Sequence, residues 1–386
     1  MSDILDRLTA ALADELPAAV ELRHELHRNP EVSGAEVRTA ARVAEALGEP
    51  EAPVVAGTGR LVRVGGEGRC VALRAELDAL AMREETAAPF ASTNDAMHAC
   101  GHDVHLAGLV AAVRTLRRVG GPLPVLAILQ PREEKHPSGG QDVAGSGRLA
   151  DEQVGAVLGV HLQPQVPLGA VAADPGVVNA ACDEIEITVR GAGGHGAYPH
   201  LAEDPVPVLC RIVGAIPDVV RDTVDPMHPS VVTLGILRAG TAPNVLAETA
   251  FTHGTIRTYR SRDRELLFDG LRRLATGYAA AHGLTAEVTY SPVEPPMANE
   301  PGLTAAVRAR LEESGFVLAP EFRSCGSDDF AFYSAVAPST MIFLGTGDGE
   351  RPPMLHDARF LPSDDRVADA ARAYLAGYVG ACSTLT

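Results

Sequence analysis

The amino-acid sequence predicts an α/β fold in which one discontinuous domain is interrupted by a smaller inserted α+β domain. The chain has 386 residues, and single hydrophobic cores stop growing at about 250–300 residues. Continuous aliphatic runs alternate with helical segments near both ends, as in a sheet covered on both faces. The middle of the chain has a different order of elements. We expect the outer domain over residues 1–173 and 294–386, with the insertion over 174–293.

The outer domain is expected to begin and end with helices. Apolar residues at helical spacing predict a helix over 3–28. Ser33 and Glu36 have the spacing of a capping box, which would begin a second helix ending near residue 47. The other elements expected here are strands over 71–74, 125–129, 156–160 and 340–344, and helices over 105–119, 299–314 and 365–380.

The insertion is expected to be a half-exposed sheet, because apolar and polar residues alternate in it. Strands are predicted over 183–190, 230–237, 248–258 and 285–290, and helices over 204–220 and 262–282. This β-α-β-β-α-β order is that of the split βαβ, or ferredoxin-like, unit.

The composition excludes several classes of partner. Fifty acidic residues against 33 Lys and Arg give a formal charge of −17. Such a chain repels phosphate backbones and anionic lipid, so we expect no nucleic-acid or membrane partner. Lys135 is the only lysine, which leaves one candidate for any P-loop or Schiff-base chemistry. Scattered cysteines without a C-x-x-C pair, and an N-terminus without a secretory pattern, predict a cytoplasmic protein.

The densest group of ionisable side chains is the segment Met97–His105, with the sequence MHACGHDVH. Cys100 offers a thiolate, and the histidines offer imidazoles. Both are favoured ligands of zinc and similar divalent ions. The alternative is a polar loop before a helix, with Asp103 helping the helix N-terminus.

A second group follows the predicted strands. Glu133 and Glu134 come after strand 125–129, so one carboxylate could bind a metal while the other accepts a proton from water. His161 is expected at the end of strand 156–160, and His356 in a loop after strand 340–344. The alternatives are a solvated turn for the two glutamates and satisfied boundary residues for the histidines.

These positions converge on one edge of the predicted sheet. Ligands of open α/β sheets bind outside the carboxyl ends of the strands, where Glu133, Glu134 and His161 are expected. The chain has no G-x-S-x-G, P-loop or dinucleotide motif. The residues therefore favour metal-assisted hydrolysis. An electron-transfer metal site is disfavoured, because the donors mix carboxylate with imidazole and leave room for water.

The ordered motifs of the whole chain resemble those of the metal-dependent amidohydrolases of the aminoacylase and carboxypeptidase superfamily. The branch they resemble most contains hippurate hydrolases, auxin-conjugate hydrolases and N-acetyldiaminopimelate deacetylases. The shared motifs are LHRNPE (26–31), LRAELDAL (73–80), MHACGHD (97–103), QPREE (130–134), GVH (159–161), GGHGAYPH (193–200), NV (244–245), GTIR (254–257), GSDDF (326–330) and HDARF (356–360).

The resemblance implies a metallopeptidase-like catalytic domain with a mixed, largely parallel sheet, and an inserted lid and dimerisation domain. It implies Glu133 as general base and Asp78 as the carboxylate that orients a ligand. In the insertion, His195 would stabilise the oxyanion, often in a neighbouring subunit's site, while Asn244 and Arg257 would grip the substrate. The residues implied to hold one or two divalent ions (Zn, Mn, Co or Ni) are Cys100, His102, Glu134, His161 and His356.

The chain also departs from the family pattern. Glu76 stands where Asp is usual, Ala81 replaces Pro, Asp328 replaces Glu, and Asp357 follows the last implied ligand. The histidines expected to be structural or supporting are His27, His98, His105 and His200. The resemblance implies hydrolysis of N-acyl amino acids or similar small amides by a homodimer or higher oligomer. The alternatives are a dipeptidase or carboxypeptidase acting on short peptides, and a metal-binding protein without hydrolytic activity.

Overall fold

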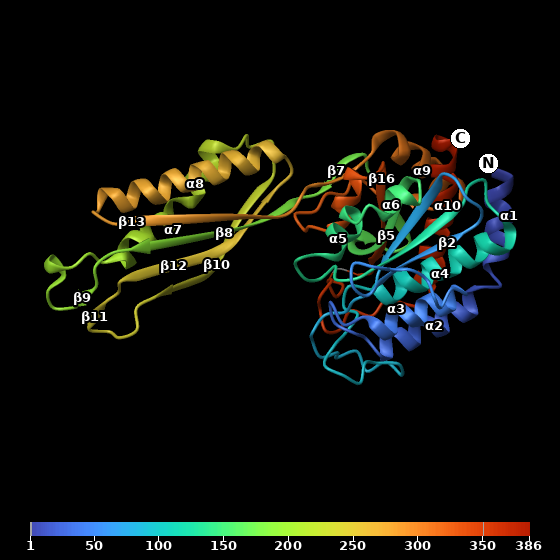
Figure 1. Ribbon diagram of the computed structural model, residues 1–386, viewed down its shortest axis with the longest axis horizontal. Helices are drawn as coiled ribbons and strands as arrows, with labels where there is room; N and C mark the ends of the chain where they lie inside the picture. Colours follow the sequence, from blue (N-terminus) through green and yellow to red (C-terminus); the bar gives the residue numbers. More distant parts are fainter. Residues whose placement is uncertain (1, 350) are drawn as a thin grey trace. The chain divides into compact units, whose positions relative to one another are not determined.

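The computed structural model describes residues 2–349 and 351–386 and divides the chain into two compact units. The first unit runs to Val178 and includes Ala298–Phe322 and Asp329–Thr386. The second unit comprises Asn179–Met297 and Arg323–Asp328. The chain therefore leaves the first unit and later returns to it (Figure 1).

A mixed eight-stranded sheet forms the centre of the first unit, in the order β1-β2-β4-β3-β5-β16-β6-β15. The four central strands, β4, β3, β5 and β16, are parallel to one another, whereas β2 and β6 flank them in the antiparallel direction. The predicted mixed, largely parallel sheet is thus confirmed. The bounds are β1 (Val54–Val55), β2 (Gly59–Val64), β3 (Cys70–Glu76), β4 (Val125–Gln130), β5 (Val154–Pro167), β6 (Ala170–Ala172), β15 (Val317–Leu318) and β16 (Ser339–Gly347).

Both faces of this sheet are covered, which explains why its central strands read as continuous aliphatic runs. Val71, Leu73 and Ala75 of β3 pack in one large hydrophobic cluster with α4 and α10, while Arg74 points to the opposite face and contacts Asp329. The helices of the unit are α1 (Ser2–Leu12), α2 (Leu16–Arg28), α3 (Val37–Ala46), α4 (His102–Val119), α5 (Gly139–Gly145), α6 (Arg148–Asp151), α9 (Pro301–Glu313), α10 (Asp365–Leu385) and the 3-10 helix η2 (Asp329–Ala335).

Two predictions near the N-terminus are wrong. The helix expected over 3–28 is broken by a turn at residues 13–15, and Pro17 occupies the first turn of α2, where its missing N–H has no intrahelical partner to lose. The capping box does not form, because α3 begins only after Glu36. The Ser33 hydroxyl instead donates to Asp78 at 2.6 Å.

A third prediction, that His161 lies at the end of a strand, is also wrong. Strand β5 continues to Pro167 and remains paired with β16 beyond His161. The extension is not visible in the sequence, because polar residues follow Leu162 and the aliphatic run ends before them.

The second unit has the predicted β-α-β-β-α-β order. Its antiparallel sheet runs β10-β12-β8-β13, and α7 and α8 pack on it through one hydrophobic cluster (Figure 1). The bounds are β8 (Ala181–Arg190), α7 (Pro205–Thr223), β10 (Ser230–Ala239), β12 (Thr249–Thr258), α8 (Ser261–Ala281) and β13 (Thr285–Glu294). The short elements are β9 (Gly194–His195), η1 (Pro199–Leu201) and β11 (Val245–Leu246), with β7 (Gly176–Asn179) and β14 (Met297–Asn299) where the chain passes between the units.

None of the helices within residues 2–349 and 351–386 is both long enough and apolar enough to cross a membrane.

Candidate metal centre

The N-terminus of α4 places two predicted ligands on either side of one glycine. Gly101 caps the helix with φ of 84°, a left-handed conformation that favours glycine. A Cβ atom at this position would lie 2.7 Å from Cδ1 of Leu162. The glycine therefore lets β5 approach the turn closely, and the buried side chains of Cys100 and His102 flank it.

His102 is held by a hydrogen bond from one ring nitrogen only, among the described residues. Its Nδ1 lies 2.8 Å from the carbonyl oxygen of Asp78, so Nδ1 carries the proton and donates it. Among the described residues its buried Nε2 has no hydrogen-bond partner, and the nearest carboxylate oxygen, Oε2 of Glu133, is 3.8 Å away. Burial alone would lower the pKa of His102, but nearby carboxylates, Glu76 first among them, raise it. The groups around His102 therefore favour positive charge at this point.

His161 has the same arrangement. Its Nδ1 donates to the carbonyl oxygen of Leu162 at 2.7 Å, so Nε2 is left with its lone pair. That Nε2 lies 3.5 Å from Sγ of Cys100. Two imidazole lone pairs and one thiol are thus directed into the same buried space, which is the donor chemistry of a site for zinc or a similar ion.

Glu134 and His356 complete the group of possible metal ligands. Donor atoms of Cys100, His102 and Glu134 all lie within 4.8 Å of one another. Nε2 of His356 is 3.2 Å from Oε1 of Glu134, and His356 itself adopts φ of 67°. Burial would raise the pKa of Glu134, but the hydrogen bond from His356 and the neighbouring histidines hold it below its usual value.

Asp78 holds two of these residues, Glu134 and His102, through hydrogen bonds. One of its carboxylate oxygens accepts from the backbone N–H of Glu134 at 2.9 Å and from Ser33. Its backbone carbonyl holds His102. Burial raises the pKa of Asp78. These contacts agree with the orienting role that the resemblance implies for it.

Sequence reasoning missed the role of Glu36, which holds the loop carrying the glutamates. The buried carboxylate of Glu36 accepts from the backbone N–H groups of Gly34 and Arg132, at 2.6 and 3.0 Å. Arg132, immediately before Glu133, adopts φ of 51°. The only signal in the sequence was the capping-box spacing of Ser33 and Glu36. The carboxylate of Glu36 binds the loop at Arg132 and does not cap its own helix as part of that box.

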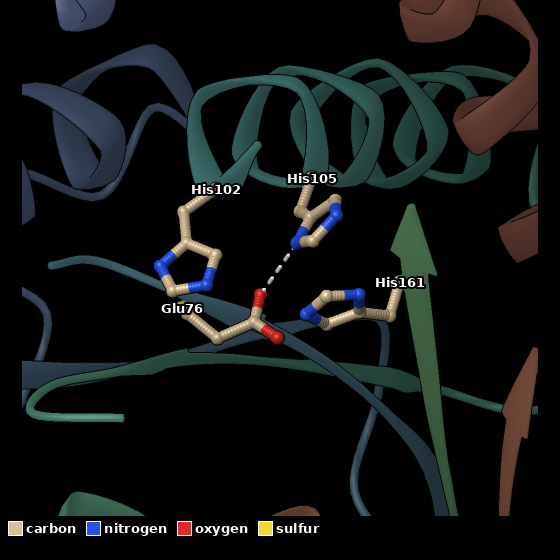
Figure 2. A group of neighbouring side chains, drawn as sticks. All are labelled: Glu76, His102, His105 and His161. Carbon is tan, nitrogen blue, oxygen red and sulfur yellow. Dashed lines mark hydrogen bonds and ion pairs between the residues drawn. The ribbon is translucent and has the colours of Figure 1, made fainter. Parts of the chain in front are cut away.

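Figure 2 shows a second buried group formed by Glu76, His102, His105 and His161. His105 is not free to bind an ion, because its Nδ1 donates to Glu76 at 2.9 Å and its Nε2 accepts from the N–H of Leu162 at 3.0 Å. Burial lowers the pKa of His105 to about 4, so the ring is neutral. The contacts therefore distinguish the three histidines. Nε2 of His102 has no hydrogen-bond partner among the described residues, Nε2 of His161 faces the thiol of Cys100, and both ring nitrogens of His105 are engaged by other groups.

In the second unit, the structure brings His195 and Asn244 together. His195 pairs with Val245 across β9 and β11, and the N–H of Gly196 donates to the carbonyl oxygen of Asn244 at 2.9 Å. Nδ1 of His195 accepts from the backbone N–H of Ala197 at 3.1 Å. The exposed Nε2 of this ring is therefore the hydrogen-bond donor in the neutral form.

Arg257 lies on β12 of the four-stranded sheet, whereas His195 lies on β9 of a separate two-stranded sheet. On β8, the partner of Arg257 is Cys182, whereas the end that leads to His195 pairs Thr249 with Arg190. Arg257 is half-buried and donates to the Ser327 hydroxyl at 2.8 Å. Within this unit, the structure does not bring Arg257 together with the other two predicted residues.

A buried cluster of Cys, His and carboxylate donors beside a further glutamate, at the edge of a largely parallel sheet, defines a metallohydrolase-type protein. The comparisons with known proteins agree. The profile of peptidase family M20/M25/M40 matches residues 72–377. The chain belongs to this family and is a metal-dependent amidohydrolase.

Several relatives cover nearly the whole chain. An N-acetylcysteine deacetylase of Bacillus subtilis is 32% identical over 340 residues, covering 86% of this chain and 89% of the relative. An N-acetyldiaminopimelate deacetylase of Listeria monocytogenes serotype 4b is 32% identical over 360 residues, covering 90% and 95%. The crystal structure of Bacillus subtilis YxeP, a dinuclear metal-binding peptidase of the M20 family, matches with a TM-score of 0.82 and 28% identity over 95% of this chain and 98% of that one.

Proposed function

We propose that the protein hydrolyses the amide bond of N-acyl amino acids or similar small amides. The site would contain one or two divalent ions (Zn, Mn, Co or Ni). The observation that carries this proposal is the pair of buried imidazoles, His102 and His161, each donating through Nδ1 and leaving Nε2 to face the thiol and carboxylates. The proposed ligands are Cys100, His102, Glu134, His161 and His356.

Glu133 is the proposed general base. A divalent ion bound here would supply Lewis-acid activation of water and of the scissile carbonyl. Glu133 lies beside the ligands, 3.8 Å from Nε2 of His102, and is itself 10% exposed. A carboxylate in that position can take a proton from water and pass it to the leaving amine. Asp78 would hold Glu134 and His102 in place.

The second unit would supply the groups that bind the substrate. His195 presents an Nε2 donor, which suits a developing oxyanion. Arg257 offers a planar fork, which suits the carboxylate of an amino acid. His195 and Asn244 lie beside the strand end that pairs Thr249 with Arg190, away from Arg257 within this unit. This separation is consistent with the expectation that His195 acts in the site of a neighbouring subunit. The deacetylase names of two relatives support N-acyl amino acids as the substrate class.

A substrate panel with metal analysis tests the proposed activity. The purified protein, loaded in turn with Zn, Mn, Co and Ni, is assayed on N-acetyl and N-benzoyl amino acids and on dipeptides with free amines. We expect turnover of the N-acyl amino acids with bound divalent metal. Turnover restricted to the dipeptides would indicate a peptidase instead. A metal-loaded protein inactive on the whole panel would indicate a binding protein.

We also propose that the protein is a homodimer or higher homo-oligomer through its second unit. Strand β10 has only one bonded neighbour within the part of the chain that the structure describes, β12, and it carries exposed Val231, Ile236 and Leu237. An apolar strand with a free edge is a site for pairing with another chain. Sedimentation at micromolar concentration should give the mass of a dimer or larger assembly, and replacing Val231 by Lys should lower that mass. A monomer under these conditions would contradict this proposal.

A further inference from the structure

The predicted ligand His161 lies on a part of β5 that extends beyond its neighbour β3. The last residue pair between the two strands joins Gly159 with Arg74, and β3 ends at Glu76. On the other side β5 still pairs with β16, where Phe343 faces His161. Beyond Gly159, the N–H groups of β5 on the side away from β16 therefore have no β3 residue to bind, although this part of the strand is buried.

His105 supplies the hydrogen-bond acceptor that this part of β5 lacks on the β3 side. Its Nε2 accepts the N–H of Leu162 at 3.0 Å. The carbonyl oxygen of the same residue accepts the Nδ1 proton of His161 at 2.7 Å. Both polar groups of Leu162 are thus engaged, and the second of them sets the orientation and tautomer of the His161 ring.

Glu76 determines which nitrogen of His105 is the acceptor. Its Oε2 accepts the Nδ1 proton of His105 at 2.9 Å, and Arg74 binds the other carboxylate oxygen. With the proton fixed on Nδ1, Nε2 of His105 is left to accept from Leu162. The chain of contacts from Glu76 through His105 and Leu162 to His161 is buried throughout. Figure 2 shows the side chains of Glu76, His105 and His161.

We propose that His105, held by Glu76, is a positioning residue that fixes the backbone of Leu162 and thereby directs Nε2 of His161 toward the metal. This proposal rests on the metal site proposed above. The resemblance did not assign this role, and the histidine was expected only to be structural or supporting. Partners that orient a metal-binding histidine typically change metal affinity by about 10- to 100-fold when removed.

The matched variants are His105→Gln and His105→Met. The two new side chains have similar length, but only the glutamine oxygen can accept the N–H of Leu162. Metal-free protein is titrated with Co²⁺ while the thiolate-to-cobalt absorption band is followed. We expect His105→Met to bind Co²⁺ about 10- to 100-fold more weakly than the unchanged protein. His105→Gln should recover most of the affinity.

A second readout follows the tautomer directly. In metal-free protein labelled with ¹⁵N-histidine, the His161 ring, assigned by its loss in His161→Gln, should show one protonated Nδ1 in the unchanged protein. It should show a mixture of tautomers in His105→Met. Thr115→Val is the folding control. Among residues 2–349 and 351–386, this buried hydroxyl of α4 binds only the Ala111 carbonyl of its own helix, at 2.8 Å. Its Co²⁺ affinity should not change.

The outcomes separate the two proposals. If the unchanged protein shows no thiolate-to-cobalt band, the proposed metal site itself is wrong. If that band appears and His105→Met binds Co²⁺ as tightly as the unchanged protein, with a single His161 tautomer, the positioning role is overturned. If His105→Met does not fold, His105→Gln decides the question, because a folded glutamine variant with strongly weakened Co²⁺ binding would also overturn the role.

Discussion

Replacing Glu133 by Gln should abolish nearly all turnover and leave the metal content unchanged. Glutamine keeps the size of the side chain beside His102, but it cannot accept a proton. General acid–base groups contribute about 10²- to 10⁴-fold to rate, so we expect a loss of at least this order in kcat with little change in KM. The measurement is kcat on the best N-acyl substrate, with metal per chain determined on the same sample.

The contrasting variant is Cys100→Ala, which removes a proposed ligand instead of the base. Its metal content should fall, and added metal should restore part of its activity. Glu133→Gln should not respond to added metal. A glutamine variant that keeps most of its turnover, or a fully metallated and fully active alanine variant, would show that the roles are assigned to the wrong residues.

Replacing Arg74 by Met should strongly destabilise the first unit. Arg74 is 1% exposed and holds two carboxylates, Glu76 and Asp329, that are equally buried. Its Nε also donates to Gln130 at 2.8 Å. The substitution leaves two buried negative charges without their cation, and breaking a buried ion pair in this way costs about 3–5 kcal/mol. That is a large share of the roughly 5–15 kcal/mol by which a domain is stable. The loss of stability should be measurable as a lower denaturant concentration at the midpoint of unfolding.

Arg118→Met is the matched control, since it removes the same charge from a pair with Asp14 in which both side chains are more than half exposed. Exposed pairs contribute about 0–1 kcal/mol, so the midpoint of this variant should hardly move. Equal midpoints for the two methionine variants would contradict the stabilising role of the buried network.

The order of the elements could be predicted from the sequence because it depends on local patterns. The aliphatic runs of β3 and β4 and the alternating residues of β8 are visible without any knowledge of their neighbours. Boundaries that depend on tertiary contacts could not be predicted. Strand β5 extends past its aliphatic run because β16 pairs with it there, and Ser33 contacts Asp78, 45 residues away, instead of capping α3.

The residue types of the candidate site could be predicted from the sequence, but the role of each histidine could not. The segment MHACGHDVH contains His98, His102 and His105, which are chemically identical in the sequence. Only the contacts distinguish them. His102 donates through Nδ1 to a carbonyl and leaves Nε2 without a partner among the described residues, whereas His105 has both nitrogens engaged. Neither nitrogen of buried His98 has a hydrogen-bond partner among those residues, and its pKa is lowered to about 3. Burial is the largest cause of that pKa shift. The resemblance selected His102, and the hydrogen bonds now give a physical reason for that choice.

The chain completes its first unit only after the second unit has been synthesised. This order determines when each part of the protein can fold during synthesis. Cys100, His102 and Glu134 leave the ribosome early, but β16, which pairs with the strand carrying His161, begins only at Ser339, after the whole second unit. Contacts between residues this far apart in the chain form late, because a long loop must close first. The second unit can fold as soon as it is made. A nascent chain stalled before Ser339 would hold only part of the proposed metal site, and we expect it to bind the ion weakly.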